Sequence, residues 1–133
     1  MKEAIKSKFQ FSNPRIVEVS FRESQVFDKS KYQSFGLNYE TEISNKKENT
    51  ADLSLTIQVG LDEETVPFML NAKVEASFRW EDGAFEEDAV NKLLEYNAKV
   101  LLLSYLRPFI SHLIVEAGYP PFVLPFYDFS EPK

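Results

Sequence analysis

The feature that most constrains the fold is a long run in which apolar and polar residues alternate. From Val66 to Trp80 every second side chain is apolar, and from Asn71 onward the positions between them are polar, as at Lys73 and Glu75. Successive side chains of a strand point to opposite faces, so this pattern predicts a long antiparallel strand with one buried and one solvated face. The chain is therefore expected to fold around an antiparallel sheet.

Three further segments alternate in the same way, so that the predicted sheet has four strands: Arg15–Glu23, Leu37–Ser44 and Leu53–Leu61. The last of these is joined to the long strand by a short acidic link at 62–64, which suits a hairpin, so these two strands are expected to pair. In the first segment, one face is expected to hold Val17, Val19 and Phe21.

The periodicity changes after Gly83, where strands give way to helix. Acidic residues at 86–88 suit a helix N-terminus, because carboxylates are stabilised by the positive end of the helix dipole. A first short helix is expected to break at Asn97. A long helix is then expected from Ala98 to Ala117, ended by Gly118.

The predicted long helix is apolar on more than one side. Its apolar residues begin with the run Val100–Leu103, which points around most of a turn, and continue as far as Val115. A helix that is apolar nearly all round must be buried on two sides, and with a single sheet the second cover is expected from another subunit. We therefore expect a tetramer, or at least a dimer. The expected interface residues are Leu102, Leu106, Phe109 and Leu113.

Prolines shape the C-terminal part of the chain. Pro108 lies inside the predicted helix and should bend it, either as a tolerated kink or as one that tilts the helix end for function. Beyond the helix, Pro120, Pro121 and Pro125 force residues 119–129 into an extended path. The aromatic side chains of this tail either pack inward as a strap over the core or line a groove; they are Tyr119, Phe122, Phe126, Tyr127 and Phe129.

The residue inventory excludes several classes of protein. The 133 residues carry 15 basic and 21 acidic groups, a net charge of −6, and the lysines are scattered, so the basic stripe of a nucleic-acid-binding protein is missing. The absence of cysteine excludes disulfides and thiolate sites and suits a reducing cytosol. Neither a signal-type apolar segment nor a membrane-spanning run is present. We expect a soluble, cytoplasmic protein with a single domain over residues 1–133.

The sequence also lacks a recognisable set of catalytic residues. The one histidine, His112, adjoins Ser111, and neighbouring helix positions diverge by about 100°, so the two cannot pair as base and nucleophile. The acidic residues at 86–88 are explained more simply as a helix start than as metal ligands. The four glycines are isolated, so no phosphate-binding loop exists. We expect no enzyme activity, no metal site and no cofactor.

Two segments near the C-terminus resemble the signature of the bacterial SecB chaperones. That signature places a tyrosine and an arginine before an Ile-Ser-Asn-Leu helix, then Phe-Pro and an apolar extended loop that ends near Asn-Phe. This chain has Leu-Ser-Tyr-Leu-Arg-Pro-Phe-Ile-Ser-His-Leu at 103–113 and Ala-Gly-Tyr-Pro-Pro-Phe-Val-Leu-Pro at 117–125, with His112 in place of the usual asparagine. With Glu-Val-Ser-Phe at 18–21, the likeness covers roughly residues 8–129. The matching positions are Tyr105, Arg107, Ile110, Ser111, Leu113, Pro120 and Phe129.

The resemblance implies an α+β fold in which helices and an extended Pro/aromatic tail pack on one face of a four-stranded antiparallel sheet. Dimers would pair through sheet edges, and two dimers would join through the long helices into a homotetramer. It also implies an ATP-independent holding chaperone that binds unfolded or precursor polypeptides in support of protein export, without nucleic-acid binding or membrane insertion. The implied peptide-binding residues are Phe27, Tyr32, Phe35, Tyr119, Phe122 and Phe126.

Two departures from the family pattern bear on its partners. Relatives that work with the translocation motor SecA carry acidic docking residues, and here Glu18 matches one such position, whereas Arg22 and Asn71 stand at others. The additional C-terminal helix and acidic tail of those relatives have no counterpart before Lys133. The alternative is therefore a SecB-like chaperone dedicated to one partner, such as an antitoxin, without delivery to SecA. A small enzyme with a pocket in the sheet is a third, disfavoured hypothesis.

Overall fold

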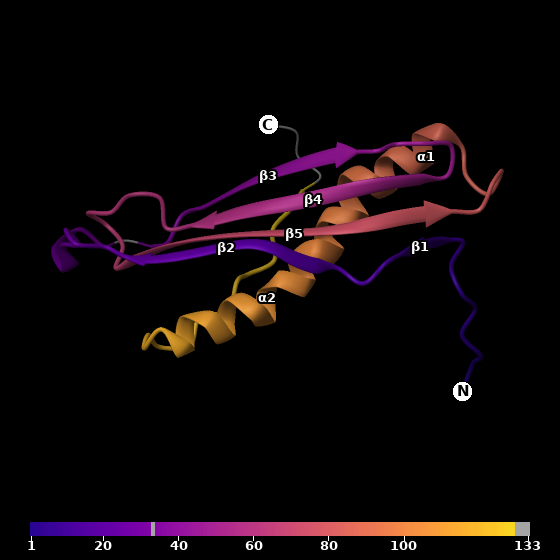
Figure 1. Cartoon of the computed structure of the whole chain (residues 1–133). Helices are drawn as coiled ribbons and strands as arrows, with labels where there is room; N and C mark the ends of the chain where they lie inside the picture. The colour runs from indigo at the N-terminus through magenta and orange to yellow at the C-terminus, as the bar shows by residue number, and fades with distance from the viewer. Residues whose placement is uncertain (33, 130–133) are drawn as a thin grey trace.

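The computed structural model describes residues 1–32 and 34–129, so Gln33 and the last four residues of the predicted domain lie outside the described residues. Within the described residues the chain forms five strands, which build one antiparallel sheet, followed by a long helix that crosses a single face of it (Figure 1). The predicted α+β class, with its antiparallel sheet and long C-terminal helix, is confirmed. The strands are β1 (Phe9–Phe11), β2 (Arg15–Glu23), β3 (Leu37–Ser44), β4 (Thr50–Val59) and β5 (Phe68–Trp80).

The long alternating strand, β5, lies at the centre of the sheet. It pairs with β4 on one side, in a register that runs from Thr50 opposite Arg79 to Val59 opposite Leu70, and β3 lies beyond β4. On its other side β5 pairs with β1 and β2, which follow each other along the same edge. The predicted pairing of β4 with β5 is confirmed. The fifth strand was not expected, because β1 has only three residues and is fixed by its pairing with the distant end of β5.

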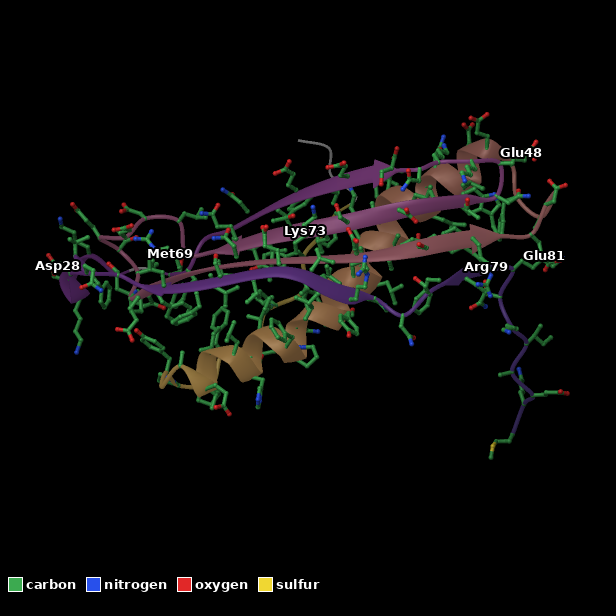
Figure 2. The ribbon with its side chains drawn as sticks, in the orientation of Figure 1. Asp28, Glu48, Met69, Lys73, Arg79 and Glu81 are labelled. Atoms are coloured by element: carbon green, nitrogen blue, oxygen red, sulfur yellow. The ribbon has the colours of Figure 1, made fainter. Side chains whose placement is uncertain are left out.

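The two faces of the sheet differ as the alternation predicts. On β5 the side chains of Phe68, Leu70 and Val74 are buried toward the helix, whereas Lys73 and Arg79 point to the opposite face (Figure 2). The same division holds on β4. This buried face carries the hydrophobic core, which is completed by the helix and by the tail.

A β-bulge in β2 changes one predicted face. Ile16 lies opposite Val74 and Glu18 lies opposite Lys73, so two steps along β2 match one step along β5. Val17 is the extra residue. Ile16 packs against the core in the place where Val17 was expected, and Phe21 packs there as predicted. The expectation that Val17 shares a face with Phe21 was wrong, because a bulge inverts the alternation at one position without leaving a clear mark in the sequence.

The helix continues through the position where a break was expected. It consists of α1 (Glu87–Lys92), a π-helical turn η2 (Leu93–Asn97) and α2 (Ala98–Glu116). Asn97 is the last residue of the π turn, which widens the helix by one residue without interrupting it. The helix ends as predicted near Gly118, whose φ of +94° suits a residue without Cβ.

By length and composition, the helix from Glu87 to Glu116 is long and apolar enough to cross a membrane. In the fold, one side of α2 packs against β4 and β5. The buried side chains of α2 are Ala98, Leu102, Leu103, Leu106, Ile110 and Ile114.

Candidate functional site

An apolar cavity of about 500 Å³ opens at one end of the molecule, where three segments meet. The connection between β2 and β3 forms one wall, the start of β5 forms the floor, and the end of α2 with the first residues of the tail forms the other wall. Every lining residue except Lys29 is apolar or aromatic. The lining residues are Phe27, Lys29, Tyr32, Phe35, Pro67, Phe68, Ile114, Tyr119, Pro120, Pro121 and Phe122.

Five of the six predicted peptide-binding residues line this cavity. Phe27, Tyr32 and Phe35 come from the first wall, and Tyr119 and Phe122 come from the tail. The segments are far apart in sequence, and the fold brings them together. Phe68, Pro67 and Ile114 were not predicted as lining residues. The strand and helix patterns mark Phe68 and Ile114 as core residues, and Pro67 has no sequence signal of its own.

The rings of the cavity form a continuous network of edge and tilted contacts. Phe35 occupies the centre: its ring lies 4.7 Å from that of Phe68, 5.5 Å from that of Phe122 and 6.0 Å from that of Tyr32. Phe68 in turn lies 4.7 Å from Tyr119. Such contacts are favoured by the ring quadrupoles and hold the rings in fixed orientations. The cavity is therefore a shaped aromatic surface.

Burial separates the floor of the cavity from its walls. Phe68 is only 2% exposed and belongs to the core, whereas Tyr32 is 47% exposed at the rim. Phe27, Phe35 and Phe122 are half-buried, so part of each ring faces solvent. An open groove with half-exposed rings offers apolar area that a bound segment could bury.

The tail combines both predicted roles, as strap and as groove wall. Tyr119 and Phe122 contribute to the cavity, whereas Leu124 and Phe129 are 1% and 4% exposed and pack into the core. The Phe129 ring contacts that of Tyr39 on β3 at 4.7 Å. Residues 119–122 therefore form a wall of the groove, and residues 124–129 hold the tail to the core.

Phe126, the sixth predicted peptide-binding residue, does not line this cavity. Its ring is 83% exposed and lies over the Arg107 guanidinium, 4.7 Å from ring centroid to Cζ. The tail runs back along α2, so Phe126 sits beside Arg107, seven positions before the cavity residue Ile114. At 1.5 Å of rise per residue these positions are about 10 Å apart along the helix.

The groove rim carries few charges, and most of them are paired. Lys31 contacts Glu64 at 2.9 Å, and Arg22 contacts Glu63 at 2.7 Å. The pKa of Tyr119 is raised, first by burial and then by the neighbouring Glu23 carboxylate, so its phenol stays neutral. Lys29 is the charged side chain that lines the cavity itself.

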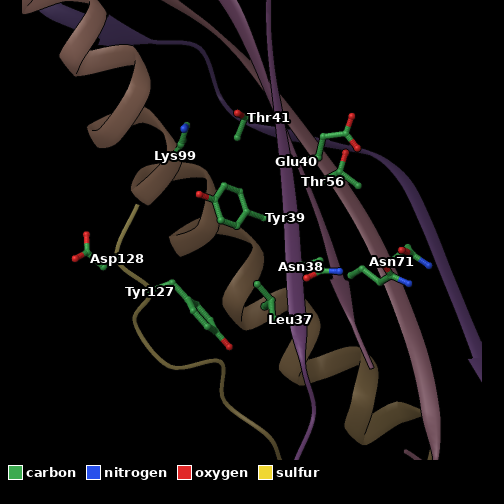
Figure 3. A pocket seen from close by; sticks show the side chains of 11 residues that line it. Leu37, Asn38, Tyr39, Glu40, Thr41, Thr56, Asn71, Lys99, Tyr127 and Asp128 are labelled. Carbon is green, nitrogen blue, oxygen red and sulfur yellow. The ribbon is translucent and has the colours of Figure 1, made fainter. Parts of the chain in front are cut away.

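A second cavity, of about 820 Å³, lies at the edge strand β3 (Figure 3). Tyr39 of β3, Lys99 of α2 and Tyr127 of the tail line one side of it, and polar residues such as Asn38 and Thr56 line the other. Burial raises the pKa of Tyr127. Within the described sheet β3 pairs only with β4, so its outer edge presents unpaired main-chain groups beside this cavity.

The predicted motor-docking residue, Glu18, lies on the face of the sheet away from the helix. It stands opposite Lys73 on β5, and on the same strand pair Arg15 contacts Glu75 at 2.8 Å. Arg22, at another docking position, contacts Glu63. At these positions of β2, therefore, Glu18 faces a basic side chain and Arg22 is itself basic.

Part of the predicted oligomer interface is corrected by burial. Leu102 and Leu106 are fully buried within the subunit, so a partner subunit cannot contact them while this packing holds. They fill the core because their side of α2 faces the sheet. Phe109 and Leu113 are half-buried and remain partly accessible. The more exposed apolar residues of the helix are Val100, Tyr105 and Val115.

Ser111 and His112 are engaged separately. The Ser111 hydroxyl donates a 2.6 Å hydrogen bond to the Phe122 carbonyl, and the His112 ring lies 3.6 Å from the Glu116 carboxylate. Within residues 1–32 and 34–129, histidine and acidic side chains do not gather in groups of three that could hold a metal ion.

Comparisons with known proteins agree with this geometry. The family model described as SecB, preprotein translocase subunit SecB, matches residues 3–131. The sequence is 27% identical over 124 residues to the uncharacterized protein MJ0357 of Methanocaldococcus jannaschii, a match that covers 90% of this chain and 79% of that protein.

Two solved structures share the fold. The Mycobacterium tuberculosis SecB-like chaperone Rv1957, in complex with a ChAD peptide from the HigA1 antitoxin Rv1956, matches with a TM-score of 0.72 at 12% identity, over 90% of this chain and 91% of that one. A protein of unknown function from Streptococcus agalactiae matches with a TM-score of 0.53 at 10% identity, over 92% and 100% of the two chains.

Proposed function

The chain belongs to the SecB family, and from that premise we propose that it is a holding chaperone that binds unfolded polypeptides without using ATP. The observation that carries this proposal is the open cavity of about 500 Å³ in which half-exposed aromatic rings from distant segments converge. Such a surface binds apolar side chains by removing them from water, which requires neither a nucleotide nor a particular client sequence.

The edge of β3 offers a second mode of contact for a client. An extended segment can add to an exposed sheet edge through main-chain hydrogen bonds, which do not depend on side-chain identity. The cavity beside β3 leaves space for the side chains of such a segment, and Tyr127 gives it an apolar patch. Ring burial in the groove and backbone pairing at β3 together support affinity for unfolded chains.

The charge pattern favours a narrow partner set as the second candidate. Glu18 faces Lys73, and Arg22 pairs with Glu63, so two of the positions that would meet the motor SecA face or carry a basic side chain. A chaperone of the same fold has been solved with a peptide from an antitoxin. A role dedicated to one partner, such as an antitoxin, therefore competes with general support of protein export.

We further propose that the protein acts as a cytoplasmic homotetramer, or at least as a dimer. Val100, Tyr105 and Val115 place exposed apolar side chains on the helix, and Val17 and Val19 do so on the edge strand β2. Both surfaces are suited to contact with further copies of the chain.

Light scattering tests the chaperone activity directly. A denatured, aggregation-prone protein is diluted into buffer with and without this protein, in the absence of nucleotide. We expect suppressed scattering for several unrelated clients. Suppression for a single partner would favour the dedicated module, and no effect on any client or on a candidate antitoxin would contradict the proposal.

A matched pair of variants ties the activity to the groove. Tyr32→Ser removes a rim ring of the cavity and should weaken binding of a fluorescent unfolded peptide by about 2 kcal/mol, since aromatic anchors contribute about that much. Phe126→Ser removes a more exposed ring outside the cavity and should leave affinity unchanged. Thermal unfolding should be similar for both. Equal loss of affinity in the two variants would argue against the groove.

A further inference from the structure

The segment of the tail that forms the groove wall is held to the helix by side chains. Pro120, Pro121 and Pro125 have no main-chain N–H group, so this part of the chain cannot pair as an ordinary strand. Between residues 120 and 127 of the described chain, two hydrogen bonds join the tail to the rest of the protein. Both come from side chains of α2.

The two bonds have matching spacing on the helix and on the tail. Ser111 donates to the Phe122 carbonyl at 2.6 Å, and Arg107 Nε donates to the Leu124 carbonyl at 2.9 Å. Helix positions four apart lie on one face and rise about 6 Å, and extended positions two apart share one side and span about 6.6 Å. The helix side chains therefore act as a short ladder that replaces a neighbouring strand.

The bond from Ser111 lies at the groove itself. It fixes the main chain of Phe122, whose ring lies 5.5 Å from that of Phe35 across the cavity. The bond from Arg107 fixes the next carbonyl on the same side of the tail, and its guanidinium lies against the exposed Phe126 ring. The side chain of Leu124, whose carbonyl accepts the bond from Arg107, is buried in the core.

We propose that Ser111 and Arg107 are positioning residues that set the width of the aromatic groove by holding the tail at Phe122 and Leu124. This proposal rests on the peptide-binding function proposed above. Neither side chain lines the cavity, so both act on a client only through the wall that they hold. Without the ladder, the wall at Phe122 moves relative to Phe35 and the groove loses its preformed shape.

A double-mutant cycle separates positioning from general support of the fold. The affinity for a fluorescein-labelled unfolded peptide rich in tyrosine and leucine is measured for the wild type, Ser111→Ala, Phe122→Ala and the double variant. We expect about fivefold weaker binding for Ser111→Ala, as for the loss of one hydrogen bond. In the Phe122→Ala background the same change should have no further effect, because the ring that Ser111 positions is already gone.

Three further variants sharpen the result. Ser111→Thr keeps the hydroxyl and should restore wild-type affinity. Ser104→Ala makes the same chemical change at an exposed position of the same helix and should have no effect. Arg107→Lys keeps the charge but removes the Nε donor and should weaken binding by a similar factor.

The outcomes distinguish this proposal from the one on which it rests. If the wild type does not bind the peptide, the peptide-binding function fails and the positioning role fails with it. If the wild type binds and Ser111→Ala binds equally well, the positioning role alone is overturned. An equal loss from Ser111→Ala in both backgrounds would also overturn it, since that is the result of weakening the fold as a whole.

Discussion

At the scale of single residues, exposure decides what each aromatic ring does. Phe68 is 2% exposed and supports the fold, Phe35 and Phe122 are half-buried and shape the groove, and Phe126 is 83% exposed and covers Arg107. These residues have the same side chain and cannot be told apart by residue type. The tail was correctly expected to be extended and aromatic, but which of its rings face the cavity depends on contacts with α2 that the sequence does not reveal.

Two glycines with the same backbone requirement allow a sharp residue-scale test. Gly60 and Gly83 have φ of +82° and +73°, but a Cβ at Gly60 would lie 2.5 Å from the Phe68 carbonyl oxygen, whereas one at Gly83 would meet open space. Gly83→Ala should cost about 1 kcal/mol of unfolding free energy from backbone strain. Gly60→Ala should cost roughly 1–3 kcal/mol more, because the main chain of β5 must shift.

Chemical denaturation of the two variants measures this difference. The groove floor at Phe68 should be disturbed only by Gly60→Ala, so weaker peptide binding is expected for that variant alone. Equal stability losses at the two glycines would mean that the approach of Gly60 to β5 is looser than described.

At the scale of elements, periodicity predicts what a single element determines alone. The strands β2 to β5 and the long helix follow from alternation and from helical spacing in their own residues. The bulge at Val17, the pairing of Phe9–Phe11 with β5 and the π turn ending at Asn97 depend on neighbouring elements or on one inserted residue. Patterns within a segment do not carry that information. The buried side of α2 was missed for the same reason, since an all-round apolar helix does not show which face meets its own sheet.

The hairpin of β3 and β4 contains a carboxylate that makes stability depend on pH. Asp52 accepts hydrogen bonds from the Asn45 amide at 2.8 Å and from the Ser77 hydroxyl at 2.6 Å. These bonds, the Asn45 bond first, lower the pKa of Asp52 below its usual range. A lowered pKa in the folded state means stability that is present above the unfolded pKa of about 3.9 and is lost as the pH falls through the folded value.

Asp52→Asn should therefore lower the unfolding free energy by up to about 1 kcal/mol at pH 7. At a pH below the folded pKa, the wild-type carboxyl is neutral, and the two proteins should approach each other in stability. Urea denaturation at pH 7 and at successively lower pH gives the comparison. A stability difference that stays constant across this range would show that the carboxylate charge does not contribute.

At the scale of the whole molecule, two kinds of apolar surface occupy different places. The β2–β3 connection and the end of α2 lie at the same end of the sheet (Figure 1). The aromatic groove is lined by residues of these two segments, and the exposed apolar side chains of the helix are spread along its length. The first suits transient clients, and the second suits permanent contact with further subunits. Their separation means that assembly need not close the groove.

Variants at two neighbouring residues of α2 distinguish an effect on assembly from an effect on folding. Tyr105 is 44% exposed and Leu106 is fully buried. Tyr105→Glu should shift the protein toward smaller species with little change in thermal stability. Leu106→Glu should instead lower the unfolding free energy by several kcal/mol, because a charge would be buried in the core.

Size-exclusion chromatography with light scattering, combined with thermal unfolding, provides both readouts. A wild-type mass equal to that of one 15.4 kDa chain would contradict the proposed oligomer. Persistence of the wild-type assembly in Tyr105→Glu would move the expected contact away from this part of the helix.

The order of the groove segments along the chain has a consequence for biosynthesis. Residues 27–35 emerge from the ribosome early, whereas their partners at 119–122 are made near the end of the described chain. Until then, the rings of the first wall have no opposite wall, and the nascent protein exposes the kind of apolar segment that its finished copies are proposed to bind. A growing chain would therefore be a natural client of the mature protein, and its own synthesis should be most prone to aggregation when finished copies are scarce.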